Sequence, residues 1–118
     1  MFRFNTSFNQ PIGNWDVSSV EYMGGMFDDS FFNQDISAWD VSSVTIMWQM
    51  FGRSSFNQDI STWDVSSITD MRRMFASSAF NQDLGSWNVA NVTQCELFSE
   101  NTPQWVLPKP NFTNCDPN

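Results

Sequence analysis

The sequence of residues 32–51 is FNQDISAWDVSSVTIMWQMF, and a nearly identical sequence starts again at Phe56. The same motif starts at Phe8 and Phe80, so four units follow one another with a constant step of 24 residues. Tryptophan keeps this step throughout, and methionine keeps it until Cys95 takes its place in the last unit. A period of this length indicates a repeat protein in which each unit buries its apolar residues against its neighbours.

Each unit has two halves with different apolar spacing. In the first half, Trp15 and Val17 alternate with a polar residue, which is typical of a half-buried strand. In the second half, Val20, Met23 and Met26 follow one another at three-residue steps, which is a helical spacing. We therefore predict an α/β solenoid, similar to a leucine-rich repeat, with about four coils. Each coil has a short strand and a short helix, and the strands form a parallel sheet on one face.

The repeat also divides the chain. We predict a partial N-terminal repeat at residues 1–7, the solenoid at residues 8–98 and a proline-rich C-terminal cap at residues 99–118. The last unit closes one residue short of the others. Ser18 and Glu21 have the spacing of a helix capping box.

Composition excludes several classes of function. The chain has 118 residues with 13 Asp and Glu against 5 Lys and Arg, no His and a net charge of −8. This excess of acid argues against nucleic acid as a partner, because phosphate binding needs clustered cations. Without His, the commonest general base is missing, and we predict no catalytic residues and no enzyme. No apolar run is long enough to insert into a membrane.

The repeated motif FNQDISxWDVSSVTxMxxMF resembles the BspA-type leucine-rich-repeat surface proteins, whose repeat is common in mycoplasma surface lipoproteins and in algal and protist proteins. The resemblance covers about residues 8–98. It implies a repeat module on an exported, surface or secreted protein, with interaction or adhesion as its role. The sequence departs from the motif at Pro11, Asn88 and Cys95, all in the terminal units.

An asparagine recurs at the bend before each predicted strand. Its amide can bond the backbone of an adjacent coil, so we predict a structural ladder. The alternative is that exposed amides bind a ligand. The ladder residues are Asn9, Asn33, Asn57 and Asn81.

Two columns of aspartate accompany the strands. Adjacent strands lie about 4.8 Å apart, so outward carboxylates stack in a row and repel one another. We favour a capping or turn role, and the alternative is a weak calcium site, since calcium prefers oxygen-rich surfaces. The candidate metal ligands are Asp16, Asp40 and Asp64, and the second column consists of Asp35, Asp59 and Asp83.

Four residues in the variable positions are candidates for binding a partner. Trp48 stands where other units have Gly24 or Arg72, and an exposed tryptophan is a frequent contact residue. The candidates are Trp48, Arg53, Arg72 and Arg73.

Cys95 and Cys115 lie in or beside the predicted cap, and we favour a disulfide over two free thiols. Such a bond constrains a loop of the unfolded chain and adds about 3 kcal/mol to stability. It also suits an oxidising compartment. Glycosylation sequons begin at Asn5, Asn91 and Asn111, close to the number expected by chance from the Asn, Ser and Thr content.

Two functions follow from these observations. The first is a non-enzymatic extracellular or cell-surface module that binds a protein or glycan. The second is a structural subunit that stacks on other copies of itself, because an uncapped coil end exposes apolar surface and an unclosed contact builds filaments.

Overall fold

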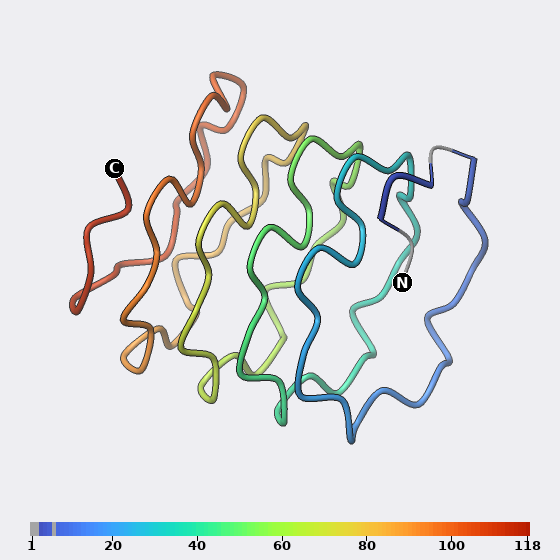
Figure 1. Cartoon of the computed structure of the whole chain (residues 1–118), viewed down its shortest axis with the longest axis horizontal. Helices are drawn as coiled ribbons and strands as arrows, with labels where there is room; N and C mark the ends of the chain where they lie inside the picture. The colour runs from blue at the N-terminus through green and yellow to red at the C-terminus, as the bar shows by residue number, and fades with distance from the viewer. Residues whose placement is uncertain (1–2, 6) are drawn as a thin grey trace.

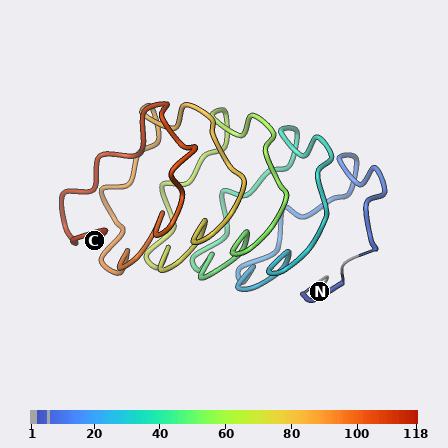
Figure 2. The same cartoon turned by 90° about the horizontal axis from the view of Figure 1, so that it is seen from above.

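The computed structural model describes residues 3–5 and 7–118, and its chain winds into coils that lie side by side in one row (Figure 1). The first coil and the C-terminal tail lie at opposite ends of this row (Figures 1 and 2). The coils are coil 1 (residues 8–31), coil 2 (32–55), coil 3 (56–79) and coil 4 (80–102), and residues 103–118 form the tail.

Each coil changes direction at four tight turns. At every turn a backbone N–H donates to the carbonyl oxygen three residues earlier, and the intervening segments are extended or irregular. In coil 2 these bonds join Trp39 to Ile36 (3.1 Å), Val44 to Val41 (3.0 Å), Met50 to Met47 (3.2 Å) and Gly52 to Gln49 (3.3 Å).

The prediction of a strand and a helix in every coil is wrong. The described part of the chain contains neither helices nor strands. Its parallel pairing consists of isolated bridges in the half of the coil that was predicted to be helical, and the Trp-Asp-Val segments form none of them. The bridges pair Tyr22 with Ile46, Ile46 with Asp70, and Asp70 with Gln94. The chain is therefore a stack of turn-built coils, and the α/β solenoid with a parallel sheet is overturned.

Backbone conformation explains why the helical spacing does not produce a helix. Gln49 has a φ of 53° and Arg53 a φ of 52°, whereas an α-helix requires a negative φ at every residue. Corresponding residues have the same left-handed conformation in the other coils: Gly25, Arg73 and Leu97 in the first column, and Asp29, Ser77 and Asn101 in the second. Because these columns keep the 24-residue step through Asn101, coil 4 stays in register with the other coils, and Phe98 occupies the position of Met50 and Met74.

Backbone groups that a helix would use internally bond the next coil instead. The N–H of Met47 donates to the carbonyl of Asp70 at 3.0 Å, and the N–H of Phe51 donates to Met74 at 2.8 Å. Equivalent bonds join coil 1 to coil 2 and coil 3 to coil 4. Each coil is thus held mainly by its neighbours.

The core contains stacked aromatic rings that continue from coil to coil. Within coil 2 and into coil 3, the rings of Phe51 and Phe56 stack with centroids 4.2 Å apart. Phe56 in turn stacks on Phe32 at 6.2 Å and on Phe80 at 6.1 Å. All of these rings are fully buried, so each Phe column contributes hydrophobic burial between coils.

Candidate interaction surfaces

The first aspartate column closes a turn in each coil. Oδ1 of Asp40 accepts hydrogen bonds from the backbone N–H of Ser42 at 3.0 Å and from its hydroxyl at 2.6 Å. Asp16 and Asp64 repeat this geometry with their own serines. The hydroxyl of Ser18, predicted to cap a helix, therefore donates to a carboxylate instead.

These carboxylates repel one another but are stabilised locally. The side-chain hydrogen bond from Ser42, followed by its backbone bond, holds the pKa of Asp40 below its usual value of 3.8. The charges of Asp64 and Asp16 act in the opposite direction and are the weaker influence. Within residues 3–5 and 7–118, no three carboxylate or thiol groups lie close enough to hold a metal ion. Calcium binding by this row stays a prediction.

The second aspartate column lines a polar groove. One hollow of about 620 Å³ lies where coil 3, coil 4 and the tail meet, and a second hollow of about 240 Å³ lies beside coils 2 and 3. Asp59 lines both hollows, so they are neighbours along this edge, and the two together are called the groove. The larger is lined by Asp59, Ser61, Gln82, Asp83, Gly85, Ser86, Leu107 and Pro108, and the smaller by Asp35, Ser37, Gln58, Asp59 and Thr62.

The predicted binding residues lie in coils 2 and 3. Arg53 and Arg73 line a common hollow of about 230 Å³. Trp48 is only partly exposed, and the guanidinium carbon of Arg3 lies 5.6 Å from the centroid of its ring. Arg72 occupies the position of Trp48 in the next coil.

All three of these arginines already have carboxylate partners. Arg72 makes bonds of 3.0 and 2.8 Å to the two oxygens of Asp70, and this pairing raises the pKa of Arg72. Arg73 lies 3.7 Å from Glu100, with both side chains about half exposed. The third, Arg53, contacts both oxygens of a carboxylate in coil 1. Arg53 and Arg73 therefore bridge neighbouring coils, whereas Arg72 pairs within its own coil, and these pairings reduce the capacity of all three to recognise an external anion.

The carboxylate that binds Arg53 is Asp28, which is fully buried. Its Oδ2 also accepts hydrogen bonds from Nε of Arg3 at 3.0 Å and from Nε2 of Gln49 at 3.2 Å. The backbone N–H of Phe4 donates to the Asp28 carbonyl at 2.8 Å. This cluster anchors the segment at residues 3–5 to coil 1.

The asparagines form a continuous ladder. Oδ1 of Asn9 accepts from the backbone N–H of Asn33 at 2.8 Å, and Asn33 and Asn57 repeat the contact toward the next coil. Oδ1 of Asn81 accepts from the N–H groups of Val106 and Leu107. The ladder thus satisfies backbone donors from coil 2 into the tail.

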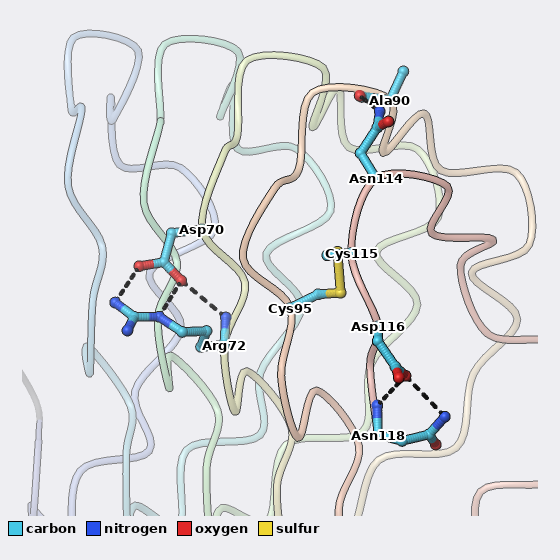
Figure 3. Close-up of a disulfide and its surroundings, with 8 residues drawn as sticks. All are labelled: Asp70, Arg72, Ala90, Cys95, Asn114, Cys115, Asp116 and Asn118. Atoms are coloured by element: carbon cyan, nitrogen blue, oxygen red, sulfur yellow. Dashed lines mark hydrogen bonds and ion pairs between the residues drawn. A yellow bond between two sulfur atoms is a disulfide. The ribbon is translucent and has the colours of Figure 1, made fainter.

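A disulfide ties the tail to coil 4. Figure 3 shows Cys95 and Cys115 joined across the two segments, with an S–S distance of 2.07 Å and a Cα–Cα distance of 5.9 Å. Close by, Nδ2 of Asn114 donates to the carbonyl of Ala90 at 2.6 Å (Figure 3). Cys95 is fully buried, so this bond anchors the tail directly on the core.

The sequence of residues 1–106 matches a family described as Mycoplasma protein of unknown function, DUF285. The chain belongs to this family. The DUF285 match agrees with the resemblance to mycoplasma repeat proteins at the level of the family. Comparisons with curated proteins and with solved structures gave no significant match. In the described residues of this DUF285 protein, no helix has the length and apolar character that spanning a bilayer requires.

The DUF285 match ends inside the tail. Cys95 therefore belongs to the family region, whereas Cys115 lies beyond it. The disulfide thus fastens the end of the tail to the repeats.

The sequons differ in their surroundings. Asn5 is exposed, but its Oδ1 accepts from the N–H groups of Ser7 and Phe8, and Thr6 lies outside the described residues. Nδ2 of Asn91, the atom that would carry a glycan, donates to a backbone carbonyl of coil 3 at 2.7 Å. Asn111 is exposed on the tail. Use of any of these sites stays a prediction.

Sequence analysis missed the groove as a site, although it recognised the second aspartate column. Gln58 and Gln82 lie beside these carboxylates because each glutamine bonds the backbone of the asparagine one coil earlier. The signal was present as the sequence Asn-Gln-Asp, which coils 2, 3 and 4 share. The contribution of Leu107 and Pro108 could not be anticipated, because the tail lies outside the repeat.

Proposed function

We propose that this chain is a non-enzymatic, extracellular or cell-surface module that binds a protein or glycan. Two findings support this proposal. The chain belongs to a mycoplasma family, and the finer resemblance to BspA-type surface repeats favours an exposed location. The disulfide between Cys95 and Cys115 suits an oxidising compartment.

The observation that carries the proposal is the groove with Asp59 at its centre. The groove crosses three coils and reaches the tail, so it offers an extended surface to a partner. Carboxylates, amides and hydroxyls line it, while Leu107 and Pro108 provide an apolar wall at one end. Ligand sites commonly combine an apolar wall with a few polar groups that fix orientation.

The chemistry of the groove favours a partner that donates hydrogen bonds and carries positive charge. Asp35, Asp59 and Asp83 each accept a hydrogen bond at Oδ1 from the backbone N–H two residues later, and the side chains of Ser37 and Ser61 also bond Asp35 and Asp59. Because a carboxylate has about four acceptor sites, each retains capacity to accept from a partner. The net charge of −8 attracts cationic partners over long distances. A basic segment of a protein, or an amine-bearing glycan, fits this surface.

Binding to an immobilised oligolysine peptide and to chitosan oligosaccharide, with neutral dextran as reference, tests the proposal. The variant Asp59→Asn/Asp83→Asn removes two charges from the groove. The matched control Asp16→Asn/Asp40→Asn removes two charges from the other column. We expect the groove variant to bind more weakly than the control. Equal losses of affinity in the two variants would show general charge attraction and would contradict the groove as the binding site. A parent chain that binds neither probe would overturn the proposed binding function.

A second function, assembly by end-to-end stacking, is favoured by a separate observation. Among the described residues, the large apolar side chains that are exposed all lie at the two ends of the row, in residues 4–31 and in the tail. They are Phe4, Trp15, Tyr22, Phe31, Val106 and Leu107. Exposed apolar patches mark interaction sites. A rise in particle mass with protein concentration is the expected result, and a constant monomer mass would contradict it.

A further inference from the structure

We infer that the coil 4 end of the groove receives a lysine side chain of a partner protein, with its stem against Leu107 and Pro108 and its ammonium group on Asp83. This inference rests on the binding function proposed above and deepens it, because it selects a basic segment of a protein over an amine-bearing glycan. It also identifies Gly85 as the residue that keeps this end of the groove open.

The two hollows of the groove differ in size and in lining. The hollow beside coils 2 and 3 measures about 240 Å³ and is lined by polar residues. The hollow at coil 3, coil 4 and the tail measures about 620 Å³ and has Leu107 and Pro108 in its wall. Leu107 is 41% exposed, so a ligand can reach it. The larger hollow therefore suits a group that is apolar along its length and polar at its end.

Gly85 makes room in the larger hollow. It stands where coils 2 and 3 have Ser37 and Ser61. A Cβ atom at Gly85 would lie 3.2 Å from Oδ1 of Asp83 and 3.3 Å from Cβ of Pro108, which is closer than ordinary van der Waals contact. The φ of Gly85 lies outside the left-handed region, so its backbone does not require glycine. The absence of a side chain thus leaves space between the carboxylate and the proline.

The same glycine leaves Asp83 with fewer partners than the equivalent aspartates. Asp35 and Asp59 are each bonded by both the backbone and the side chain of the serine two residues later. Oδ1 of Asp83 accepts from the backbone N–H of Gly85 at 2.9 Å, and glycine has no hydroxyl to donate. The exposed Asp83 carboxylate therefore has more remaining capacity to accept hydrogen bonds than the other two.

The lysine of the tail does not fill this end of the groove. Lys109 follows Pro108, but its Nζ donates to the carbonyl of Trp105 at 3.3 Å and lies 5.3 Å from the centroid of that ring. Lys109 is not among the residues that line the larger hollow. A cation from a partner can therefore approach Asp83.

The chemistry of this site matches lysine. Lysine lays its long alkyl stem along apolar surface while its ammonium group reaches a polar partner. The amine of a glycan is attached directly to the sugar ring and has no stem to lie against Leu107. Ammonium is a compact charge that needs a single carboxylate oxygen, whereas guanidinium pairs best with both. At Asp83, one of the two oxygens already accepts from Gly85.

Probes that carry the same charge on different stems test the inference. They are oligolysine, an oligomer of diaminobutyrate with a shorter stem, and chitosan oligosaccharide, all with equal numbers of amines. Calorimetry on the full chain, with its disulfide intact, measures binding in mildly acidic buffer that keeps the amines charged. We expect the parent to bind oligolysine about fivefold or more tightly than the shorter oligomer. Leu107→Ser should remove this preference, and Val106→Ser, at an exposed position outside the lining, should keep it.

A second variant fills the space at Gly85. Gly85→Ser restores the serine of coils 2 and 3, which narrows the hollow and gives Asp83 a hydroxyl partner. It should weaken oligolysine binding by about fivefold. Ala38→Ser adds the same hydroxyl at an exposed position outside both hollows and should leave binding unchanged. Thermal unfolding verifies that each variant folds, and Asp83→Asn, which keeps the size of the side chain, should weaken binding equally if Gly85→Ser lowers the Tm.

The outcomes separate this inference from the function on which it rests. Equal affinity of the parent for oligolysine and for the shorter oligomer would overturn the lysine site and leave the binding function standing. Tighter binding of chitosan than of oligolysine would do the same. Unchanged oligolysine binding in Leu107→Ser or in a folded Gly85→Ser would also overturn the inference. A parent chain that binds none of the probes overturns the inference and the proposed function together.

Discussion

The indole Nε1 of Trp63 in coil 3 donates a 3.0 Å hydrogen bond to the carbonyl oxygen of Ile36 in coil 2. Trp39 and Trp87 make the same bond to the preceding coil, at 2.9 and 3.1 Å. Each tryptophan therefore fills the core and also satisfies a buried carbonyl of its neighbour.

Replacing Trp63 with phenylalanine tests this double role. The variant leaves the buried carbonyl of Ile36 without its donor, so we expect a loss of about 1–3 kcal/mol in the free energy of unfolding. Urea unfolding measures the loss. Trp15→Phe is the comparison, because its side chain is 41% exposed and its loss should be smaller. Equal losses at the two positions would contradict the proposed role.

The asparagine ladder makes a second prediction. Asn57 is partly buried, and its Oδ1 accepts from the backbone N–H of Asn81 at 2.8 Å. Asn57→Ala leaves this donor unpaired and should lower the free energy of unfolding by about 1–3 kcal/mol. The exposed Asn14 lies outside the ladder, so Asn14→Ala should change stability little. Amide hydrogen exchange at Asn81 should accelerate in the first variant alone, and unchanged exchange would argue against the ladder.

The left-handed backbone conformation of Arg73 predicts which of two substitutions gives the more stable protein. Arg73 has a φ of 55°, a conformation that costs about 1 kcal/mol for a residue with a Cβ and little for glycine. Both Arg73→Gly and Arg73→Ala remove the weak pair with Glu100, so they differ mainly in backbone strain. Thermal unfolding should find the glycine variant more stable than the alanine variant. The opposite order would show that this residue relaxes to a negative φ.

Removing the disulfide should release the tail. The free energy of unfolding of the double variant Cys95→Ala/Cys115→Ala should be lower by about 3 kcal/mol, because the disulfide no longer constrains the unfolded state. Limited proteolysis should then cleave within residues 103–118 before the coils. Asn114→Ala, which removes only a hydrogen bond to coil 4, should keep the tail resistant. A resistant tail in the double variant would show that Trp105 and the ladder hold it unaided.

The aspartate turns predict a loss of stability in acid. Hydrogen bonds from serine lower the pKa values of five exposed aspartates below 3.8 in the folded chain. Their contribution is therefore full above pH 3.8 and is lost as the pH falls through the lowered values. Asp40→Asn keeps an acceptor, as Asn88 does in coil 4, where it accepts from Ala90 at 3.1 Å. Urea unfolding from about pH 5 to pH 2 should show a weaker pH dependence for this variant. A steeper pH dependence of stability in the variant would contradict the role assigned to the Asp40 carboxylate.

Much of the packing could be predicted from the sequence, because the columns repeat. Trp39 and Val41 are buried and Asp40 is exposed, as their alternation indicates. That alternation does not require pairing between β-strands, and these segments form turns rather than paired strands. Similarly, the spacing of Met47 and Met50 fits a tight turn as well as a helix.

The conformation of Gln49 and Arg53 could not be predicted, because neither residue type favours a positive φ. Gly25 was the signal available, since glycine occupies the equivalent position in coil 1 with a φ of 68°. The inter-coil bonds that stabilise this conformation depend on the whole stack and are invisible in a single unit. The groove depends equally on the fold, because its walls come from separate coils and the tail.

The bonds between neighbouring coils also affect how such a gene can change. Because the coils repeat the same turns and bond the coils beside them, a duplication or loss of one 24-residue unit preserves the pattern of backbone bonds between coils, provided that Asp28 of coil 1 keeps Arg53 as its partner. Each added unit would lengthen the molecule by about 4.8 Å without altering the chemistry of its ends. Unequal recombination between repeats could therefore produce a series of proteins that differ in reach but attach in the same way.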